Sequence, residues 1–156
     1  IPAGPLRENL GSLKDAQIVL LNGKKNVSFE KKIFKINSNV QILYSNYIPI
    51  NAERFKNKKF IAIAGIGNPE NFFDLLKKTG IIIKKNHILP DHHQFNKEEV
   101  ENIIKEAEDN NCDVILTEKD YFKLKDFSLK RVECLKVELN IPEKEKLLKT
   151  ILEIYD

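Results

Sequence analysis

One short segment of the chain places a carboxylate directly beside two imidazoles. The segment Asp91-His92-His93 follows an apolar stretch, and such a trio can form a general base, a proton relay or part of a metal site. Adjacent side chains point in different directions, so one metal ion is a poor match for both histidines. Catalytic or substrate-facing use, a loop-structuring role and metal binding are the three interpretations. We predict no metal ligands in this chain.

A second segment has the composition of a tight strand-to-helix turn. In Gly65-Ile66-Gly67-Asn68-Pro69, the glycines allow close backbone approach, and a helix N-terminus offers free N–H groups to an anion. The full Gly-x-Gly-x-x-Gly pattern is absent because position 70 is glutamate. The segment therefore predicts either a structural turn or a phosphate-binding turn that uses Gly65, Gly67 and Asn68.

The segment Thr117-Glu118-Lys119-Asp120 also carries two interpretations. Thr117 is a suitable helix N-cap, and an acid at Asp120 is favourable near a helix N-terminus. The alternative is that the polar groups of this segment contact a substrate or its phosphate.

Close to the beginning of the chain, Pro2-Ala3-Gly4-Pro5-Leu6 leads into Arg7-Glu8. A guanidinium is always charged and matches a phosphate with two parallel hydrogen bonds. An isolated Arg-Glu pair is more often an exposed ion pair of little energetic value.

Strands and helices must position these segments. From Lys59 onward, short apolar runs alternate with amphipathic stretches, a pattern that predicts an α/β fold: a parallel sheet with helices on both faces. Parallel strands bring their carboxyl ends to one edge, so we expect the segments after Ala64, Ile88 and Leu116 to meet there. The expected strands are Phe60–Ala64, Ile81–Ile88, Asp113–Leu116 and Glu133–Leu139. The expected helices follow Asn68, Asn96, Thr117 and Pro142.

The first part of the chain has a different pattern. An apolar run, Ala16–Leu21, predicts a buried strand that ends at the turn residues Asn22-Gly23. Alternation in Lys32–Ile36 and Val40–Tyr47 predicts a β-hairpin. The polar stretch Pro49–Lys58 is expected to be a linker.

Composition limits the classes of function. The chain has 156 residues, a net charge of +3 and 42% hydrophobic residues, and no apolar run approaches the roughly 20 residues that cross a bilayer. The weak, scattered positive charge fits an anionic substrate or a membrane surface better than nucleic acid. The chain begins with Ile1 and contains no methionine, so we expect it to be a piece of a longer protein.

Taken together, four segments resemble the tetraacyldisaccharide 4'-kinases, the lipid A 4'-kinases of Gram-negative bacteria. The resemblance spans Pro2 to about Leu139 in the order and approximate spacing of that family. The segments that carry it are Pro2–Glu8, Ala64–Phe73, Asp91–Phe95 and Thr117–Leu124.

The resemblance implies a division of the chain. Residues 1–28 would end a P-loop kinase domain, residues 29–58 would form a two-stranded linker, and residues 59–156 would form a C-terminal α/β domain. The ATP and Mg²⁺ sites of the family lie mainly in the P-loop half, and this sequence contains no Gly-x-x-x-x-Gly-Lys-Ser/Thr motif.

The resemblance also implies roles for single residues. Arg7 and Glu8 would lie at the phosphate-transfer site. His92, with Asp91, would face that site from the second domain and assist a base on the P-loop half. The expected contacts to substrate or phosphate are Glu8, Gly65, Gly67, Asn68, His93, Thr117, Glu118, Lys119 and Asp120.

The activity implied is phosphorylation by ATP of the 4'-hydroxyl of a tetraacyldisaccharide 1-phosphate, a glycolipid. The enzyme would act at the cytoplasmic face of the inner membrane as a peripheral protein, without nucleic acid. We expect the chain alone to be inactive. One alternative is a non-catalytic α/β module that binds an anion or nucleotide. Another is a metal-dependent phosphoesterase, but the sequence shows none of the further acidic clusters that such an enzyme needs.

Overall fold

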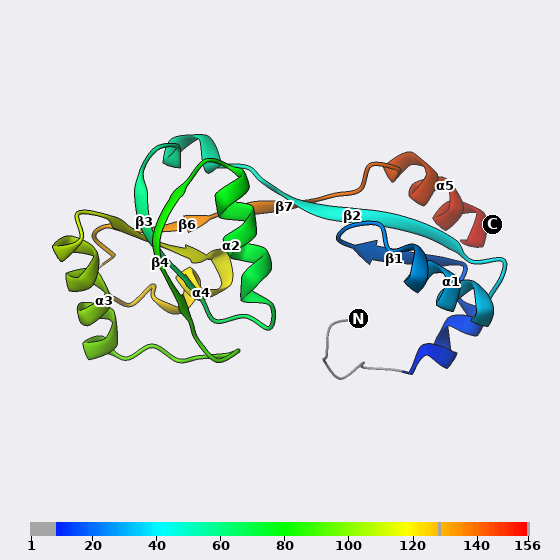
Figure 1. The fold of residues 1–156 in the computed structure, drawn as a ribbon. Helices are drawn as coiled ribbons and strands as arrows, with labels where there is room; N and C mark the ends of the chain where they lie inside the picture. The colour runs from blue at the N-terminus through cyan, green and yellow to red at the C-terminus, as the bar shows by residue number, and fades with distance from the viewer. Residues whose placement is uncertain (1–8, 128, 156) are drawn as a thin grey trace. The chain divides into compact units, whose positions relative to one another are not determined.

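The computed structural model describes residues 9–127 and 129–155 and divides the chain into two compact units. Unit 2 is the continuous stretch Pro49–Glu138, and unit 1 combines the described residues up to Ile48 with those from Leu139 onward (Figure 1). This division differs from the expected boundaries after residues 28 and 58, because the C-terminal segment belongs with the N-terminal one.

Unit 2 is built on a four-stranded sheet with the order β4-β3-β5-β6. Each pair of neighbours is parallel, as the alternation of strands and helices predicted. The strands are β3 (Lys59–Ala64), β4 (Ile82–Ile88), β5 (Asp113–Thr117) and β6 (Val132–Leu135).

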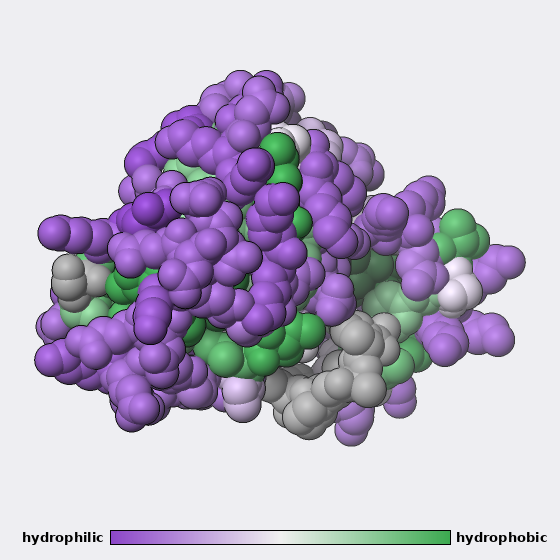
Figure 2. Space-filling view, turned by 60° about the vertical axis from the view of Figure 1, so that its left-hand side comes forward, coloured by the Kyte–Doolittle hydropathy of each residue, from purple (hydrophilic) through white to green (hydrophobic). Residues whose placement is uncertain are grey.

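Helices cover both faces of this sheet, because the side chains of a strand alternate between its two faces. Phe60, Ala62 and Ala64 of β3 belong to one core cluster with residues of α2 (Pro69–Lys78). Ile61 and Ile63 belong to a second cluster with residues of α3 (Lys97–Asp109). The predicted α/β class, with helices on both faces of a parallel sheet, is therefore confirmed. The face in Figure 2 is dominated by hydrophilic side chains, as expected when the apolar residues lie in these two clusters.

The ends of two helices show ordinary capping chemistry, with one exception. The side chain of Asn96 caps α3 by accepting a hydrogen bond from the Glu99 N–H, and Gly80 ends the α2 region with a φ of 79°, which a glycine adopts without strain. Asn68 precedes α2, but its side chain makes no capping hydrogen bond.

The stretch expected to be a polar linker carries part of the core. A short 3-10 helix, η2 (Ala52–Phe55), buries both of its apolar end residues. The Phe55 ring meets Phe60 edge to face, with 5.6 Å between centroids.

Unit 1 contains a parallel strand pair, so the predicted hairpin is wrong. Strand β1 (Ile18–Asn22) pairs in parallel with β2 (Gln41–Pro49). Parallel neighbours need a crossover, and α1 (Val27–Ile36) supplies it. The alternation in residues 32–36 is too short to separate a strand period from a helical one.

The strand expected at Glu133–Leu139 is also wrong in one respect. The single strand expected at Glu133–Leu139 is two strands, β6 and β7 (Val137–Asn140), which lie in different sheets. Strand β7 adds to β2 and gives the order β1-β2-β7. The unit also contains the 3-10 helix η1 (Leu10–Asp15) and the C-terminal helix α5 (Lys144–Tyr155).

Among the described residues, no helix is both long enough and apolar enough to cross a membrane.

Two phenylalanines of unit 2 provide a test of where the core lies. Phe73 of α2 is completely buried, whereas the Phe122 side chain, on α4 (Glu118–Lys123), is 65% exposed. We expect Phe73→Ala to lower the free energy of unfolding by about 3–5 kcal/mol, because it leaves a cavity. Phe122→Ala should change it by less than about 0.5 kcal/mol. Urea unfolding followed by circular dichroism measures both, and equal losses would contradict the described packing.

Candidate functional site

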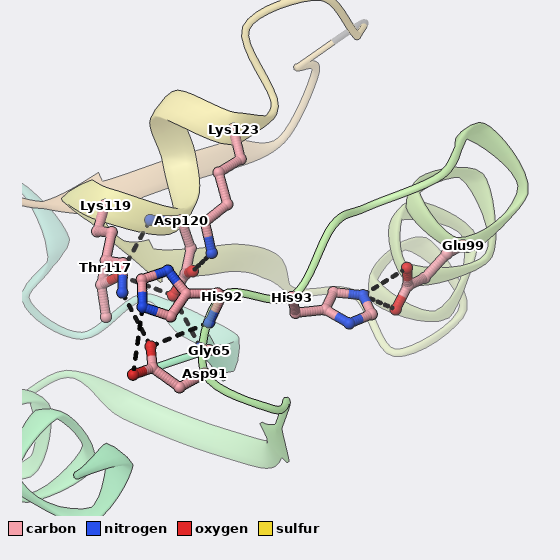
Figure 3. Close-up of polar contacts among 9 residues, drawn as sticks. All are labelled: Gly65, Asp91, His92, His93, Glu99, Thr117, Lys119, Asp120 and Lys123. Carbon is pink, nitrogen blue, oxygen red and sulfur yellow. Dashed lines mark hydrogen bonds and ion pairs between the residues drawn. The ribbon is translucent and has the colours of Figure 1, made fainter. Parts of the chain in front are cut away.

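Three turns meet at the carboxyl edge of the unit 2 sheet, as the sequence predicted. The turn after β3 touches the segment after β5 through a hydrogen bond from the Gly65 N–H to Asp120 Oδ2 (2.8 Å). The turn after β4 touches that same segment through Lys119 Nζ and Asp91 Oδ1, 2.9 Å apart. Figure 3 shows these contacts together. Residues from all three predicted segments therefore form one cluster.

A buried carboxylate holds two of the three turns together. Asp120 is fully buried, and its Oδ2 also accepts a hydrogen bond from the Thr117 hydroxyl (2.7 Å). Lys123 Nζ lies 2.8 Å from its Oδ1. The Asp120 N–H donates to Thr117 Oγ1, so Thr117 is the helix N-cap that its position predicted. Both carboxylate oxygens are bonded to protein groups, and the substrate or phosphate contact expected of Asp120 stays a prediction.

Gly65 is required by the close approach of the same carboxylate. A Cβ atom at this position would lie 3.1 Å from Asp120 Oδ1 and 3.3 Å from the carbonyl oxygen of Pro90. Its N–H donates to Asp120, so this residue orders the turn, and the phosphate contact expected of Gly65 stays a prediction. Gly67 and Asn68 are exposed, which leaves them accessible to a ligand.

Burial is the largest influence on the pKa of Asp120 and raises it. The hydrogen bonds from Lys123, Gly65 and Thr117 oppose burial and together bring the pKa below its ordinary value. Asp120 is consequently a carboxylate at neutral pH, and its negative charge is balanced by Lys123.

Asp91 is the second carboxylate of the edge and is partly exposed. The hydrogen bond from Lys119 lowers the pKa of Asp91 more than any other contact. The His92 N–H also donates to its Oδ1 (3.0 Å). Asp91 is therefore a charged group with a fixed direction, in contact with solvent.

His92 is largely exposed and has an unusual backbone conformation. Its φ of 62° is in the left-handed region, which a residue with a Cβ rarely adopts. The side chain is 79% exposed, and Nε2 lies 3.8 Å from Asp91 Oδ2. A strained, exposed imidazole beside a carboxylate is a feature typical of functional sites.

His93 points the other way and is held by protein. Its Nε2 lies 2.9 and 2.8 Å from the two carboxylate oxygens of Glu99, on α3. Its ring meets Phe95 edge to face, 5.0 Å between centroids, and the side chain is only 23% exposed. The two adjacent imidazoles diverge, as Figure 3 shows. The substrate contact expected of His93 stays a prediction.

Sequence reasoning missed two residues of this cluster, Lys123 and Glu99. Lys123 follows Asp120 by three residues on α4, a spacing that places both on one helix face and could have indicated the ion pair. Glu99 occupies the third position after the Asn96 cap, where an acidic residue is common whether or not it takes part in a site. Nothing in that spacing shows that it reaches back to His93.

The described residues offer no cluster of three or more His, Cys, Asp or Glu side chains that could hold a metal ion. Both edge carboxylates are paired with lysines, Asp91 with Lys119 and Asp120 with Lys123. Arg7 and Glu8 lie outside the described residues, and Glu118 lies in the first turn of α4.

A parallel α/β sheet whose polar groups gather at its carboxyl edge defines a class of proteins that bind ligands at that edge. The family model described as tetraacyldisaccharide-1-P 4'-kinase matches residues 1–156. The chain belongs to this family, as its sequence motifs predicted.

Individual relatives agree with the family assignment. The chain is 33% identical to a tetraacyldisaccharide 4'-kinase of Pelagibacter ubique, with 99% of this chain and 50% of the relative covered. It is 37% identical to that of Rickettsia bellii, with 98% and 47% covered. The chain thus spans about half the length of these relatives.

A solved structure also resembles the chain. The crystal structure of LpxK from Aquifex aeolicus in complex with ATP matches with a TM-score of 0.59 and 25% identity, covering 100% of this chain and 48% of that one. The ATP belongs to that crystal structure.

The contacts of Asp120 with Gly65, Thr117 and Lys123 predict a specific dependence of stability on pH. A carboxyl group whose pKa is lower in the folded state stabilises the fold above its unfolded pKa of about 3.9, and this contribution disappears as the pH falls through the folded pKa. We therefore expect Asp120→Asn to lower the free energy of unfolding at pH 7 by about 2–4 kcal/mol. The loss of stability on acidification should also become shallower.

Urea unfolding at a series of pH values from 7 to 3 measures both effects. Asp126→Asn is the matched control, because Asp126 is exposed in the same unit. An Asp120→Asn variant as stable as the Asp126→Asn variant at pH 7 would show that the buried carboxylate does not hold the turns.

Proposed function

We propose that this chain is part of a lipid kinase of lipid A biosynthesis, one that transfers the γ-phosphoryl group of ATP to the 4'-hydroxyl of a tetraacyldisaccharide 1-phosphate. A bond forms between the 4'-oxygen and the γ-phosphorus, the bond to the β-phosphate oxygen breaks, and the hydroxyl proton passes to a base. The family match over the whole chain supports the proposal. The observation that carries it is the exposed His92 beside Asp91, at the meeting point of three turns.

His92 has the chemistry that assists removal of the hydroxyl proton. Its imidazole is accessible to a substrate, and a histidine can accept a proton near neutral pH. Asp91 is charged and 3.8 Å from Nε2, so it can balance the positive charge that forms on the ring when the proton arrives. The hydrogen bond from Lys119 keeps the Asp91 carboxylate oriented.

Other groups at the edge are proposed to bind the substrate or its phosphate. Lys119 is partly exposed and positively charged, and Gly67 and Asn68 are accessible at the start of α2. Thr117 and Glu118 directly precede Lys119 at the start of α4, although the Thr117 hydroxyl already donates to Asp120. Arg7 and Glu8 complete the proposal from the segment outside the described residues.

ATP is the phosphoryl donor of the proposed reaction, with Mg²⁺ as its counter-ion. This chain contains neither a P-loop motif nor, in the ranges that the structure describes, a suitable group of metal ligands. We therefore assign both to the part of the enzyme outside this chain. In this proposal the chain contributes His92 and Asp91, which assist removal of the hydroxyl proton.

The proposed partner is a glycolipid with a phosphate, presented at the cytoplasmic face of the inner membrane. A net charge of +3 is compatible with an anionic lipid surface, which attracts basic groups within a Debye length. The protein would be peripheral to the membrane.

The two adjacent histidines allow a sharp test in the full-length protein. We expect His92→Ala to lower kcat by about 10²–10⁴, the usual effect of losing a group that takes part in proton transfer. The decrease in kcat caused by His93→Ala should be at least about tenfold smaller, because His93 is held by Glu99 and points away from Asp91. Steady-state transfer of ³²P from labelled ATP to the tetraacyldisaccharide 1-phosphate measures both. A low kcat for His93→Ala together with a normal kcat for His92→Ala would reverse the assignment of the catalytic histidine.

The assignment of ATP to the rest of the enzyme gives a separate prediction. The 156-residue chain alone should show no tight binding of MgATP, because it lacks the backbone amides and lysine of a P-loop. Isothermal titration calorimetry tests this with the full-length protein as a positive control. A dissociation constant of about 1 μM for the chain alone, equivalent to roughly 8 kcal/mol, would mean that a nucleotide site lies within it.

A further inference from the structure

We infer that Glu99 is a positioning residue, which directs His92 toward the substrate by holding the neighbouring His93. The inference rests on the proposed function, because it assumes that His92 takes part in the reaction. Glu99 itself does not contact His92, and its effect would pass through the backbone between the two histidines.

The contact between Glu99 and His93 is well suited to fix a side chain. Both carboxylate oxygens lie within 2.9 Å of His93 Nε2, and the Phe95 ring packs edge-on against the same imidazole. Both side chains of this contact are about three-quarters buried, so water competes little for it. These contacts leave the His93 ring little freedom to rotate.

Glu99 is itself held in place. It lies in the first turn of α3, where its N–H donates to the Asn96 side chain (2.9 Å), and the next residue, Val100, is buried in the core. The carboxylate therefore extends from a helix that is packed against the sheet. A rigid helix is a more accurate support for a functional side chain than a loop.

His92 is restrained from both sides along the chain. On one side, Lys119 holds Asp91; on the other, Glu99 holds His93, and the His93 N–H closes the turn on the Pro90 carbonyl (3.1 Å). A left-handed φ of 62° at His92 is unfavourable for an isolated residue and persists only where the surroundings enforce it. Releasing His93 removes one of the two restraints, so the His92 imidazole should sample other directions.

A second His–Glu pair on the same helix separates positioning from simple stabilisation. His87 of β4 contacts Glu106 of α3, with 2.9 Å between Nε2 and Oε2, and Glu106 also pairs with Lys85. This pair has the same chemistry as the Glu99–His93 pair and also joins α3 to the sheet. Its histidine, however, lies on strand β4 and not in the turn that contains His92. Glu106→Ala is therefore a matched control for loosening α3.

The test is a double-mutant cycle in the full-length kinase. We expect Glu99→Ala to lower kcat by about tenfold with little change in KM, as found for residues that orient a functional group. In a His92→Ala background the same substitution should have no further effect, because no imidazole is left to orient. A purely structural effect of Glu99 would add to the loss in the His92→Ala enzyme.

Two exposed or remote controls and one conservative variant complete the experiment. Glu98→Ala removes an acid from the same first turn of α3, and Glu106→Ala breaks the other His–Glu pair; we expect both to leave kcat within about twofold of wild type. Glu99→Gln retains an acceptor for a neutral His93 and should recover most of the activity.

The outcomes distinguish the two proposals. A normal kcat for His92→Ala would overturn the proposed role of His92, and the positioning role with it. A low kcat for His92→Ala together with a normal kcat for Glu99→Ala would overturn the positioning role alone. Equal losses for Glu99→Ala and Glu106→Ala, or additive losses in the cycle, would also overturn it.

Discussion

A charged carboxylate without access to solvent is costly unless hydrogen bonds and an opposite charge compensate for the lost hydration. Asp120 satisfies this requirement with three partners: the Gly65 N–H, the Thr117 hydroxyl and Lys123. Gly65 and Thr117 lie at the ends of the neighbouring strands β3 and β5, and Lys123 lies on α4, so compensating one charge also determines how two turns meet. The small size of Gly65 follows from the same constraint, since a side chain there would crowd the carboxylate.

The turn after β4 is joined to the segment after β5 by a weaker and more exposed contact. Lys119 and Asp91 are both in contact with water, and an exposed ion pair contributes little to stability. Its value lies in geometry, because it orients a carboxylate beside His92. The edge thus combines a buried interaction that gives rigidity with an exposed one that stays available for chemistry, and both lysines lie on the short helix α4.

Much of unit 2 was predictable from the sequence, for reasons that are local. Apolar runs, the Asn96 and Thr117 caps and Gly80 each act within a few residues, and parallel strands then bring the three turns to one edge. The inward direction of Asp120 was not predictable in this way, because it depends on how α4 packs against the sheet. The partner of His93 was missed for a similar reason, since a loop residue and a helix residue six positions apart follow no periodic rule.

In unit 1 the failures have a different origin. Residues 32–36 alternate polar and apolar side chains over too few positions to distinguish a strand from a helix, and only the parallel pairing of β1 with β2 requires the helix. The stretch Glu133–Leu139 was expected to be one strand, but it changes from one sheet to the other at Lys136. Hydropathy records that such a stretch is apolar, not which neighbours it pairs with.

The two ends of unit 2 lie side by side. The Ile50 N–H donates to the Lys136 carbonyl at 3.0 Å, and the Asn51 side chain donates to the Cys134 carbonyl and accepts from the Lys136 N–H. A unit that begins and ends at neighbouring points has the arrangement of an inserted domain, since its removal leaves only a short gap to close in the host. Such a unit could be removed or replaced as a single block, because the chain enters it near Pro49 and leaves it near Glu138, and β1, α1 and most of β2 lie before the first of these points.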